Sequence, residues 1–214
     1  VSRRHGINYV FNGQHTIEIV ALVSGSRDTP VWCMIYDDLE YEQEADIFAN
    51  QQRFVKKLLP YEIFMANIEA GNDEQLIIKA LVESFHLRIC GNSKPGCICC
   101  VATLEDIYRK YGYDTLQRSL RLCIATWEGD TDSLTSNILR GIAHLIVAYK
   151  DGLKDDMFVE KVGRFSPREI GRIAKERKAG SMGYAEAMLT LYNKKSSSKG
   201  TLKWAKLYEN KQVI

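Results

Sequence analysis

The feature that most constrains the fold is a short β-type run that meets a glycine and is followed at once by a helical pattern. Residues 7–11 are rich in aromatic and β-branched side chains, Gly13 follows, and apolar residues recur with helical spacing through residues 17–23. The first N–H groups of a helix lack backbone partners, and the helix dipole favours negative charge there. The junction therefore predicts a strand, a tight turn and a helix whose N-terminus can bind an anion.

A second apolar run and an acidic helix come next. Residues 31–36 are mostly apolar, which predicts a strand covered on both faces, and residues 40–59 carry apolar side chains at helical spacing. Pro60 ends that helix or opens the next one. The remaining pattern is helical nearly to the end. We therefore expect an α+β protein with a small α/β domain at residues 1–59 and a larger all-helical domain at residues 60–214.

Composition is that of an ordinary globular chain, with 45% apolar and 26% charged residues among 214. The apolar runs are far too short to span a bilayer, so we expect no membrane association. Val1 already lies within sequence that looks structured, which predicts that the natural N-terminus is missing. The six cysteines show no regular disulfide spacing, and we expect a reducing, cytoplasmic compartment.

Residues 1–62 contain three short motifs, at residues 12–15, 50–53 and 59–62, and with them this region resembles the ParB/sulfiredoxin-like superfamily. Asn12-Gly13-Gln14-His15 is similar to the Asp/Asn-Gly-Gln-His box of a ParB-related branch, and residues 50–53 and 59–62 resemble two further ParB boxes. In that superfamily a strand, a glycine-led polar box and a helix form a nucleotide-phosphate pocket. The later part resembles an uncharacterised ParB-like family of phages and plasmids. The resemblance implies a bacterial DNA-associated protein that could bind a nucleotide, CTP or ATP, with Mg²⁺.

The same resemblance implies a set of phosphate-binding residues. Gly13 would let a phosphate approach the backbone closely, His15 could donate to it or act as an acid or base, and Arg53 could clamp it through two hydrogen bonds. The full nucleotide- or phosphate-binding set is Asn12, Gly13, Gln14, His15, Thr16, Asn50, Gln52 and Arg53.

Departures from the family pattern favour binding over catalysis. Ala49 stands where ParB carries a metal-binding glutamate, and Gln14 and Thr16 stand where sulfiredoxin chemistry needs a cysteine and an arginine. Two alternatives stay open. One is a ParB-like nuclease or nucleotide hydrolase with His15 as the catalytic residue, and the other is an interaction module with a degenerate pocket.

Charge is distributed unevenly along the chain. Residues 160–214 hold 13 Lys/Arg against 5 Asp/Glu, whereas residues 1–159 hold 16 against 22. Such a basic end can contact the phosphates of DNA, although a solvated helical surface would look the same. Spacings of four, four and three residues place the first four cations on one helical face. The predicted nucleic-acid contacts are Arg164, Arg168, Arg172, Lys175, Lys194 and Lys195. A homo-oligomer is also compatible with the sequence.

Two other groups of residues invite a metal interpretation. Cys90, Cys97, Cys99 and Cys100 lie close together, but they lack the paired spacing of a zinc knuckle, and we interpret them as small apolar residues before a helix capped by Thr103. His144 lies in an apolar run and is expected to be packed. We predict no metal site.

Overall fold

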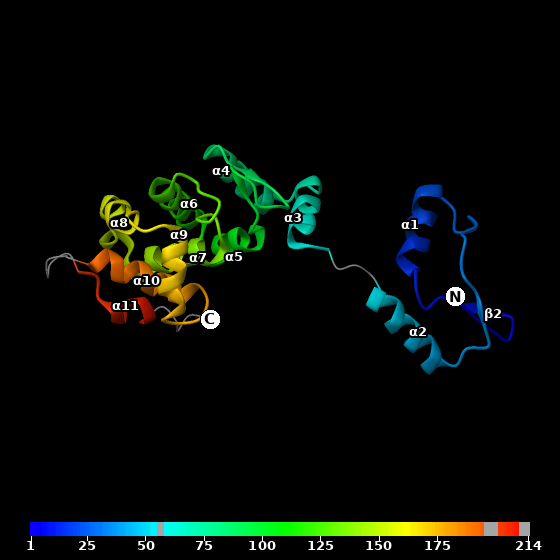
Figure 1. Ribbon diagram of the computed structural model, residues 1–214. Helices are drawn as coiled ribbons and strands as arrows, with labels where there is room; N and C mark the ends of the chain where they lie inside the picture. Colours follow the sequence, from blue (N-terminus) through cyan, green and yellow to red (C-terminus); the bar gives the residue numbers. More distant parts are fainter. Residues whose placement is uncertain (55–57, 195–200, 210–214) are drawn as a thin grey trace. The chain divides into compact units, whose positions relative to one another are not determined.

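The computed structural model describes residues 1–54, 58–194 and 201–209 (Figure 1). The chain forms two compact units, residues 1–57 and residues 58–214, called here the N-terminal and C-terminal units. The predicted boundary between residues 59 and 60 falls close to this division. The protein is mostly helical with a small mixed sheet, so its class is α+β.

The N-terminal unit is built on three short strands. Strand β1 (Ser2–Arg4) pairs with β2 (Ile7–Tyr9) in antiparallel register and with β3 (Tyr36–Asp37) in parallel register, which gives the order β2-β1-β3. His5 and Gly6 have φ values of 50° and 77°. Two consecutive residues with positive φ form the tight turn that matches the twist of a hairpin. The hairpin places β2 just before the glycine turn.

Two helices complete this unit. Helix α1 (Gln14–Ser24) begins after Gly13 and ends at Gly25, as the sequence predicts, and both glycines adopt the left-handed conformation. Helix α2 (Tyr41–Phe54) is tied to the sheet, because an Arg4 side-chain nitrogen lies 3.1 Å from a carboxylate oxygen of Glu44.

The expectation of a covered strand at residues 31–36 is wrong. Only Tyr36–Asp37 forms a strand, and the Trp32 side chain is 105% exposed. Residues before it still run beside β1, since the Val1 amino group donates to the Met34 carbonyl at 3.0 Å. With three short strands, the sheet offers these apolar side chains no second layer. Among the described residues, the only buried ones in this unit are Ser2 and Glu44.

The C-terminal unit is a helical bundle. Its described α-helices are α3 (Pro60–Glu69), α4 (Asp73–Ser84), α5 (Val101–Tyr111), α6 (Tyr113–Trp127), α7 (Ser136–Tyr149), α8 (Asp155–Val162), α9 (Pro167–Lys175), α10 (Ser181–Asn193) and α11 (Trp204–Glu209). A short 3-10 turn, Lys150–Gly152, follows α7.

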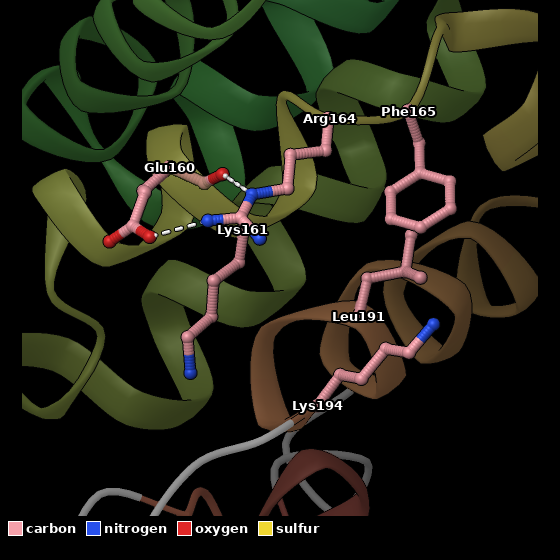
Figure 2. Close-up of a pocket in the computed structure, with 6 residues that line it drawn as sticks. All are labelled: Glu160, Lys161, Arg164, Phe165, Leu191 and Lys194. Atoms are coloured by element: carbon pink, nitrogen blue, oxygen red, sulfur yellow. Dashed lines mark hydrogen bonds and ion pairs between the residues drawn. The ribbon is translucent and has the colours of Figure 1, made fainter.

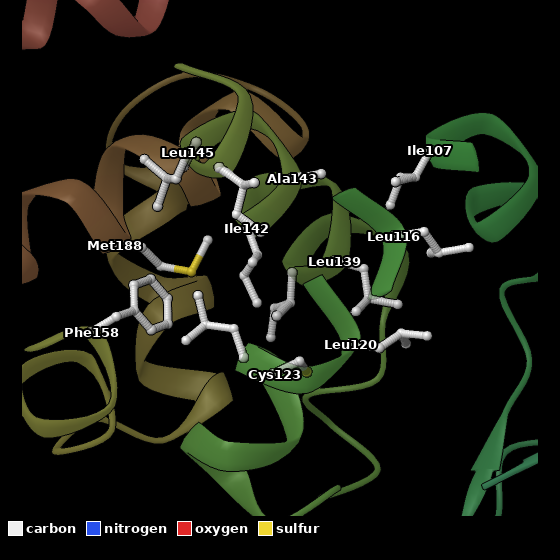
Figure 3. Packing of buried hydrophobic residues seen from close by; sticks show 14 of the residues in the cluster. Ile107, Leu116, Leu120, Cys123, Leu139, Ile142, Ala143, Leu145, Phe158 and Met188 are labelled. Atoms are coloured by element: carbon white, nitrogen blue, oxygen red, sulfur yellow. The ribbon is translucent and has the colours of Figure 1, made fainter. Parts of the chain in front are cut away.

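Helices α7 and α10 pack against each other at the centre of this bundle (Figure 3). Nine of the fourteen residues of α7 are buried, and α10 buries eight of thirteen. Gly141 allows this close packing, because a Cβ at that position would lie 2.7 Å from the Met188 Cε atom. The core therefore depends on a small residue in α7 opposite a large one in α10.

The C-terminal unit is not all helical, in contrast to the prediction. Strands β4 (Arg88–Ile89) and β5 (Cys97–Ile98) form a parallel pair, because left-handed residues at His86 and Gly96 turn the chain out of α4 and back again. A disulfide joins Cys90 and Cys97 across this loop. The interpretation of Cys90 and Cys97 as small apolar residues is therefore wrong.

The predicted cap at Thr103 is also wrong. Helix α5 begins at Val101, so Thr103 lies inside its first turn, where its hydroxyl is 2.6 Å from the hydroxyl of Ser136. The contact links α5 to the start of α7. Within the described part of the chain, no helix combines the length and the apolar character needed to cross a membrane.

Candidate functional site

The Gly13 turn is an open helix N-terminus. Gly13 has φ 84°, its N–H donates to Asn12 Oδ1 at 2.8 Å, and its carbonyl accepts from the Ile17 N–H at 3.1 Å. Glycine at the N-cap position has no side chain that could cap the first N–H groups of α1. A Cβ at this position would meet no atom within 4 Å, so the approach to the turn is open.

The polar side chains of the turn lie at the surface. His15 and Thr16 are exposed, while the Gln14 side-chain amide donates to the Val10 carbonyl at 2.9 Å and so braces the turn. No acidic residue occupies the first turn of α1. An anion at this turn would therefore meet backbone N–H groups, His15 and Thr16 without a nearby carboxylate in that turn.

Residues 50–53, three of which are predicted to bind phosphate, are only partly described. Asn50 lies in α2 and its side-chain amide donates to Asp46 Oδ2 at 3.2 Å, along its own helix. Gln52 and Arg53 also belong to α2, but their side chains lie outside the described part of the structure. The predicted phosphate clamp from Arg53 thus stays a prediction.

The predicted basic helical face is divided between two places. Arg164 does not belong to α9; it lies in the turn after α8, where its Nε donates to the Glu160 carbonyl at 3.0 Å and its Nη2 lies 2.6 Å from Glu160 Oε1. The prediction that Arg164 shares one helical face with the α9 cations is therefore wrong. Helix α8 ends before Gly163 and α9 begins at Pro167, so Arg164 lies between two separate helices.

Figure 2 shows the pocket beside Arg164, which has a volume of about 320 Å³. Lys161 Nζ donates to the Tyr192 carbonyl at 3.1 Å, so Lys161 and Arg164 both bind carbonyls near the C-termini of helices. Cations are favourable there because they meet the negative end of the helix dipole. Lys194 Nζ lies 5.8 Å from the centre of the Phe165 ring. Lys195 lies outside the described residues.

Helix α9 carries the other three predicted cations and begins at a well-formed cap. Ser166 Oγ accepts from the Glu169 N–H at 3.3 Å, and the Glu169 carboxylate accepts from the Ser166 N–H at 2.8 Å. The Ser166 hydroxyl also donates to the Glu169 carboxylate at 2.8 Å. The two hydrogen bonds that the carboxylate accepts, from the Ser166 N–H and the Ser166 hydroxyl, lower the pKa of Glu169, so the carboxylate is charged at neutral pH. The cap fixes where α9 starts and thus which side chains face outward.

Arg168, Arg172 and Lys175 project from α9 into solvent and line one pocket of about 310 Å³. The Arg168 Nε lies 2.6 Å from Asp132 Oδ2, while an Arg172 nitrogen lies 3.8 Å from the Glu169 carboxylate. Lys175 is exposed at the end of the helix. Three cations thus share a pocket in which Asp132 is the acidic lining residue.

The residues considered for metal binding have other roles. His144 Nε2 lies 3.2 Å from Ser181 Oγ, and its ring packs edge-on against Tyr111. Burial raises the pKa of Cys100 to about 11 and that of Cys123 to about 12, so neither thiol ionises readily. Among residues 1–54, 58–194 and 201–209, no cluster of three or more His, Cys, Asp or Glu is placed to hold a metal ion.

Four residues just after α9 and in α11 were not predicted as site residues. Arg177 and Lys178 follow Glu176, the C-terminal cap of α9, and they lie against the Trp204 and Tyr208 rings of α11. The three basic residues among residues 175–178 and the aromatic residues near the C-terminus can be read from the sequence. The contacts between them could not be predicted, because the partners are nearly thirty residues apart in the chain.

The fold and these surfaces define an α+β protein with a helical bundle that exposes basic residues. Residues 1–203 match DUF6551, a family of unknown function, and the chain belongs to this family. Comparison with curated proteins and with solved structures found no match.

Proposed function

We propose that this protein binds nucleic acid, and DNA in particular, through the phosphate backbone at the basic face of α9. The observation that carries the proposal is the shared pocket of Arg168, Arg172 and Lys175, in which three cations face one carboxylate. Clustered Lys and Arg residues on one helical face are the electrostatic footprint of phosphate-backbone binding.

The ion pairs that these cations already form are weak enough to be replaced by contacts with a phosphate. The Arg172 side chain is 76% exposed and its contact with Glu169 is 3.8 Å long. Exposed ion pairs of this kind contribute about 0–1 kcal/mol, because water screens both charges. Arg172 can therefore turn to a phosphate at little cost, and Lys175 is already exposed.

A duplex titration tests the proposal. We expect a fluorescently labelled duplex to bind with an affinity that falls as NaCl rises, and Lys175→Ala to weaken binding to every duplex sequence by a similar factor. Lys94→Ala, which removes an exposed lysine from the loop between β4 and β5, is the matched control and should bind as the parent protein does. Binding that ignores salt, or that survives both Lys175→Ala and Arg172→Ala undiminished, would overturn the proposal.

A second candidate function is nucleotide binding at the Gly13 turn, in a ParB-like domain of a bacterial, phage or plasmid protein working in the cytoplasm. The observation that favours it is the open approach to the left-handed Gly13, next to the exposed His15. The ligand would be CTP or ATP with Mg²⁺. In this scheme residues 1–59 form the ParB/sulfiredoxin-like domain and residues 60–214 form the DNA-binding domain, in a monomer or a homo-oligomer.

Calorimetric titration with CTP and with ATP, each with Mg²⁺, tests this second candidate. Binding should be lost in Gly13→Val, because valine disfavours the left-handed conformation and brings a side chain to the turn. Thr29→Val, placed elsewhere in the same unit, is the control. Hydrolysis of a nucleotide or of DNA that disappears in His15→Ala would favour the enzyme alternative. If neither nucleotide binds, the second candidate is overturned and the alternative of an interaction module with a degenerate pocket is favoured.

A further inference from the structure

A strip of cations and aromatic rings, formed by Arg177, Lys178, Trp204 and Tyr208, lies where the chain leaves α9. Arg177 and Lys178 follow the last residue of α9, and the Arg177 Cζ atom lies 5.6 Å from the centre of the Trp204 ring. Lys178 Nζ lies 5.5 Å from the centre of the Tyr208 ring. Helix α11 therefore brings two aromatic side chains against the two cations that come just after α9.

The two rings differ in what else holds them. Tyr208 is partly buried, and its hydroxyl donates a short hydrogen bond to a Glu186 carboxylate oxygen in α10. That hydrogen bond raises the pKa of Tyr208 to about 12. Trp204, in contrast, is a large apolar side chain that stays 38% exposed. Tyr208 anchors the helix, and Trp204 presents its ring to solvent.

Helix α11 holds Trp204 in a fixed place. Leu207 is buried at 4% exposure, and the Tyr149 hydroxyl donates to the Lys203 carbonyl at 2.9 Å, directly before Trp204. The Arg177 guanidinium over the ring restricts the indole further. A ring held in this way loses little conformational freedom when a ligand stacks on it.

We propose that Trp204 stacks on an unpaired base, so that the strand crossing this end of the α9 face is single-stranded. This inference rests on the proposed function, in which Arg172 and Lys175 contact phosphates a few residues before Arg177 in the chain. Stacking of a base on an aromatic side chain contributes about 1–3 kcal/mol, whatever the base. A base inside a duplex already has both faces stacked and cannot offer one to Trp204.

The charges around Trp204 suit such a strand. Lys203 and Lys206 flank it in the chain, and both are exposed. Arg177 can serve a neighbouring phosphate while it keeps its contact with the ring, as arginine often does at nucleic-acid surfaces. Glu176 and Glu209 are the exposed acids nearest in sequence. Cations thus outnumber acids along the strip.

Fluorescence anisotropy with a labelled oligothymidine and with a duplex of equal length tests the inference. The protein should bind oligothymidine more tightly than the duplex. Trp204→Ala should lower the affinity for oligothymidine by about 5- to 100-fold, in line with the loss of one stacked base, and leave the affinity for the duplex unchanged. Trp204→Phe should retain much of the single-strand affinity, because phenylalanine keeps an aromatic face.

Trp32→Ala is the matched control, because it removes a fully exposed indole from the N-terminal unit and should change neither affinity. Melting temperatures of all variants show that the bundle still folds. If Lys175→Ala weakens duplex binding but Trp204→Ala affects oligothymidine and duplex equally or not at all, the stacking inference is overturned while the phosphate surface stands. If neither nucleic acid binds, the proposed function is overturned, and the stacking inference is overturned with it.

Discussion

Arg168 in α9 and Asp132 in the loop before α7 form an ion pair, with Arg168 Nε 2.6 Å from Asp132 Oδ2. Both residues line the α9 pocket, and the Arg168 side chain is 83% exposed. The pair therefore contributes little to stability. Its main consequence is that Asp132 holds one of the three pocket cations and adds a negative charge where a phosphate would bind.

Neutralising that acid should strengthen phosphate binding. We expect Asp132→Asn to raise the affinity for duplex DNA by about two- to fivefold, which corresponds to the strength of one exposed ion pair. Asp151→Asn, which removes an exposed acid from the 3-10 turn after α7, should leave the affinity unchanged. Weaker binding by Asp132→Asn would show that the acid orients Arg168 rather than competing with the phosphate. Anisotropy titrations at one salt concentration suffice for the comparison.

Arg118 should be among the most important polar residues for the stability of the bundle. Its side chain is only 21% exposed, binds Asp155 Oδ1 through two nitrogens and donates to the carbonyls of Lys150 and Leu153. Arg118→Ala leaves these acceptors unpaired and should lower the free energy of unfolding by about 2–4 kcal/mol. Arg121→Ala, which removes a more exposed partner of the same Asp155, should cost less than about 1 kcal/mol. Urea denaturation measures both, and equal losses would contradict this account.

The Cys90–Cys97 disulfide closes a short loop between β4 and β5. By loop-closure entropy, its removal in Cys90→Ser/Cys97→Ser should lower the free energy of unfolding by roughly 2–3 kcal/mol. Dithiothreitol should lower the melting temperature of the parent protein but not that of the double variant. Cys33→Ser, at an exposed free cysteine, is the control. A parent protein that ignores dithiothreitol would show that the bond does not form in solution.

Alkaline pH should weaken the attachment of α11. The hydrogen bond to Glu186 raises the pKa of Tyr208 to about 12 in the folded state, whereas an unfolded tyrosine titrates near 10. The stabilisation from this hydroxyl is thus fully present below about pH 10 and is lost as pH rises through about 12. Tyr208→Phe should be less stable than the parent at pH 8 and should show a smaller decline between pH 10 and 12. An identical decline in both proteins would contradict the assignment.

Local signals predicted much of the C-terminal unit. Helix α3 begins at Pro60, which is one of the two roles that the sequence allows this proline, and α9 begins at Pro167, directly after the capping Ser166. Each of these boundaries depends on residues within one helical turn, such as a proline at the first helical position or a capping serine. Such signals act before any tertiary contact forms.

Features set by distant residues could not be predicted in the same way. The apolar run at residues 31–36 has the composition of a covered strand, yet among the described residues the sheet beside it has three short strands and only Ser2 and Glu44 are buried in this unit. Arg164 has the spacing of a fourth residue on the α9 face, yet it binds the end of α8. In both cases the surrounding packing, not the local pattern, decides the outcome.

The candidate site shows the same division. The cations of α9 follow from helical spacing, and the structure brings Arg168, Arg172 and Lys175 into one pocket. The contact between Arg177 and Trp204 depends on how α11 returns to the bundle, and no short-range pattern indicates it. The Gly13 turn has the predicted local geometry, while its phosphate clamp from Arg53 stays a prediction.

The salt dependence of DNA binding, compared between the parent protein and Arg172→Ala/Lys175→Ala, tests the central claim most directly. Each phosphate contact adds to the slope of log affinity against log salt concentration. If both cations contact phosphates, that slope should be less steep in the double variant by the contribution of about two contacts, and binding at low salt should be weaker. The same slope and the same affinity in the two proteins would contradict the claim that the α9 face binds the phosphate backbone.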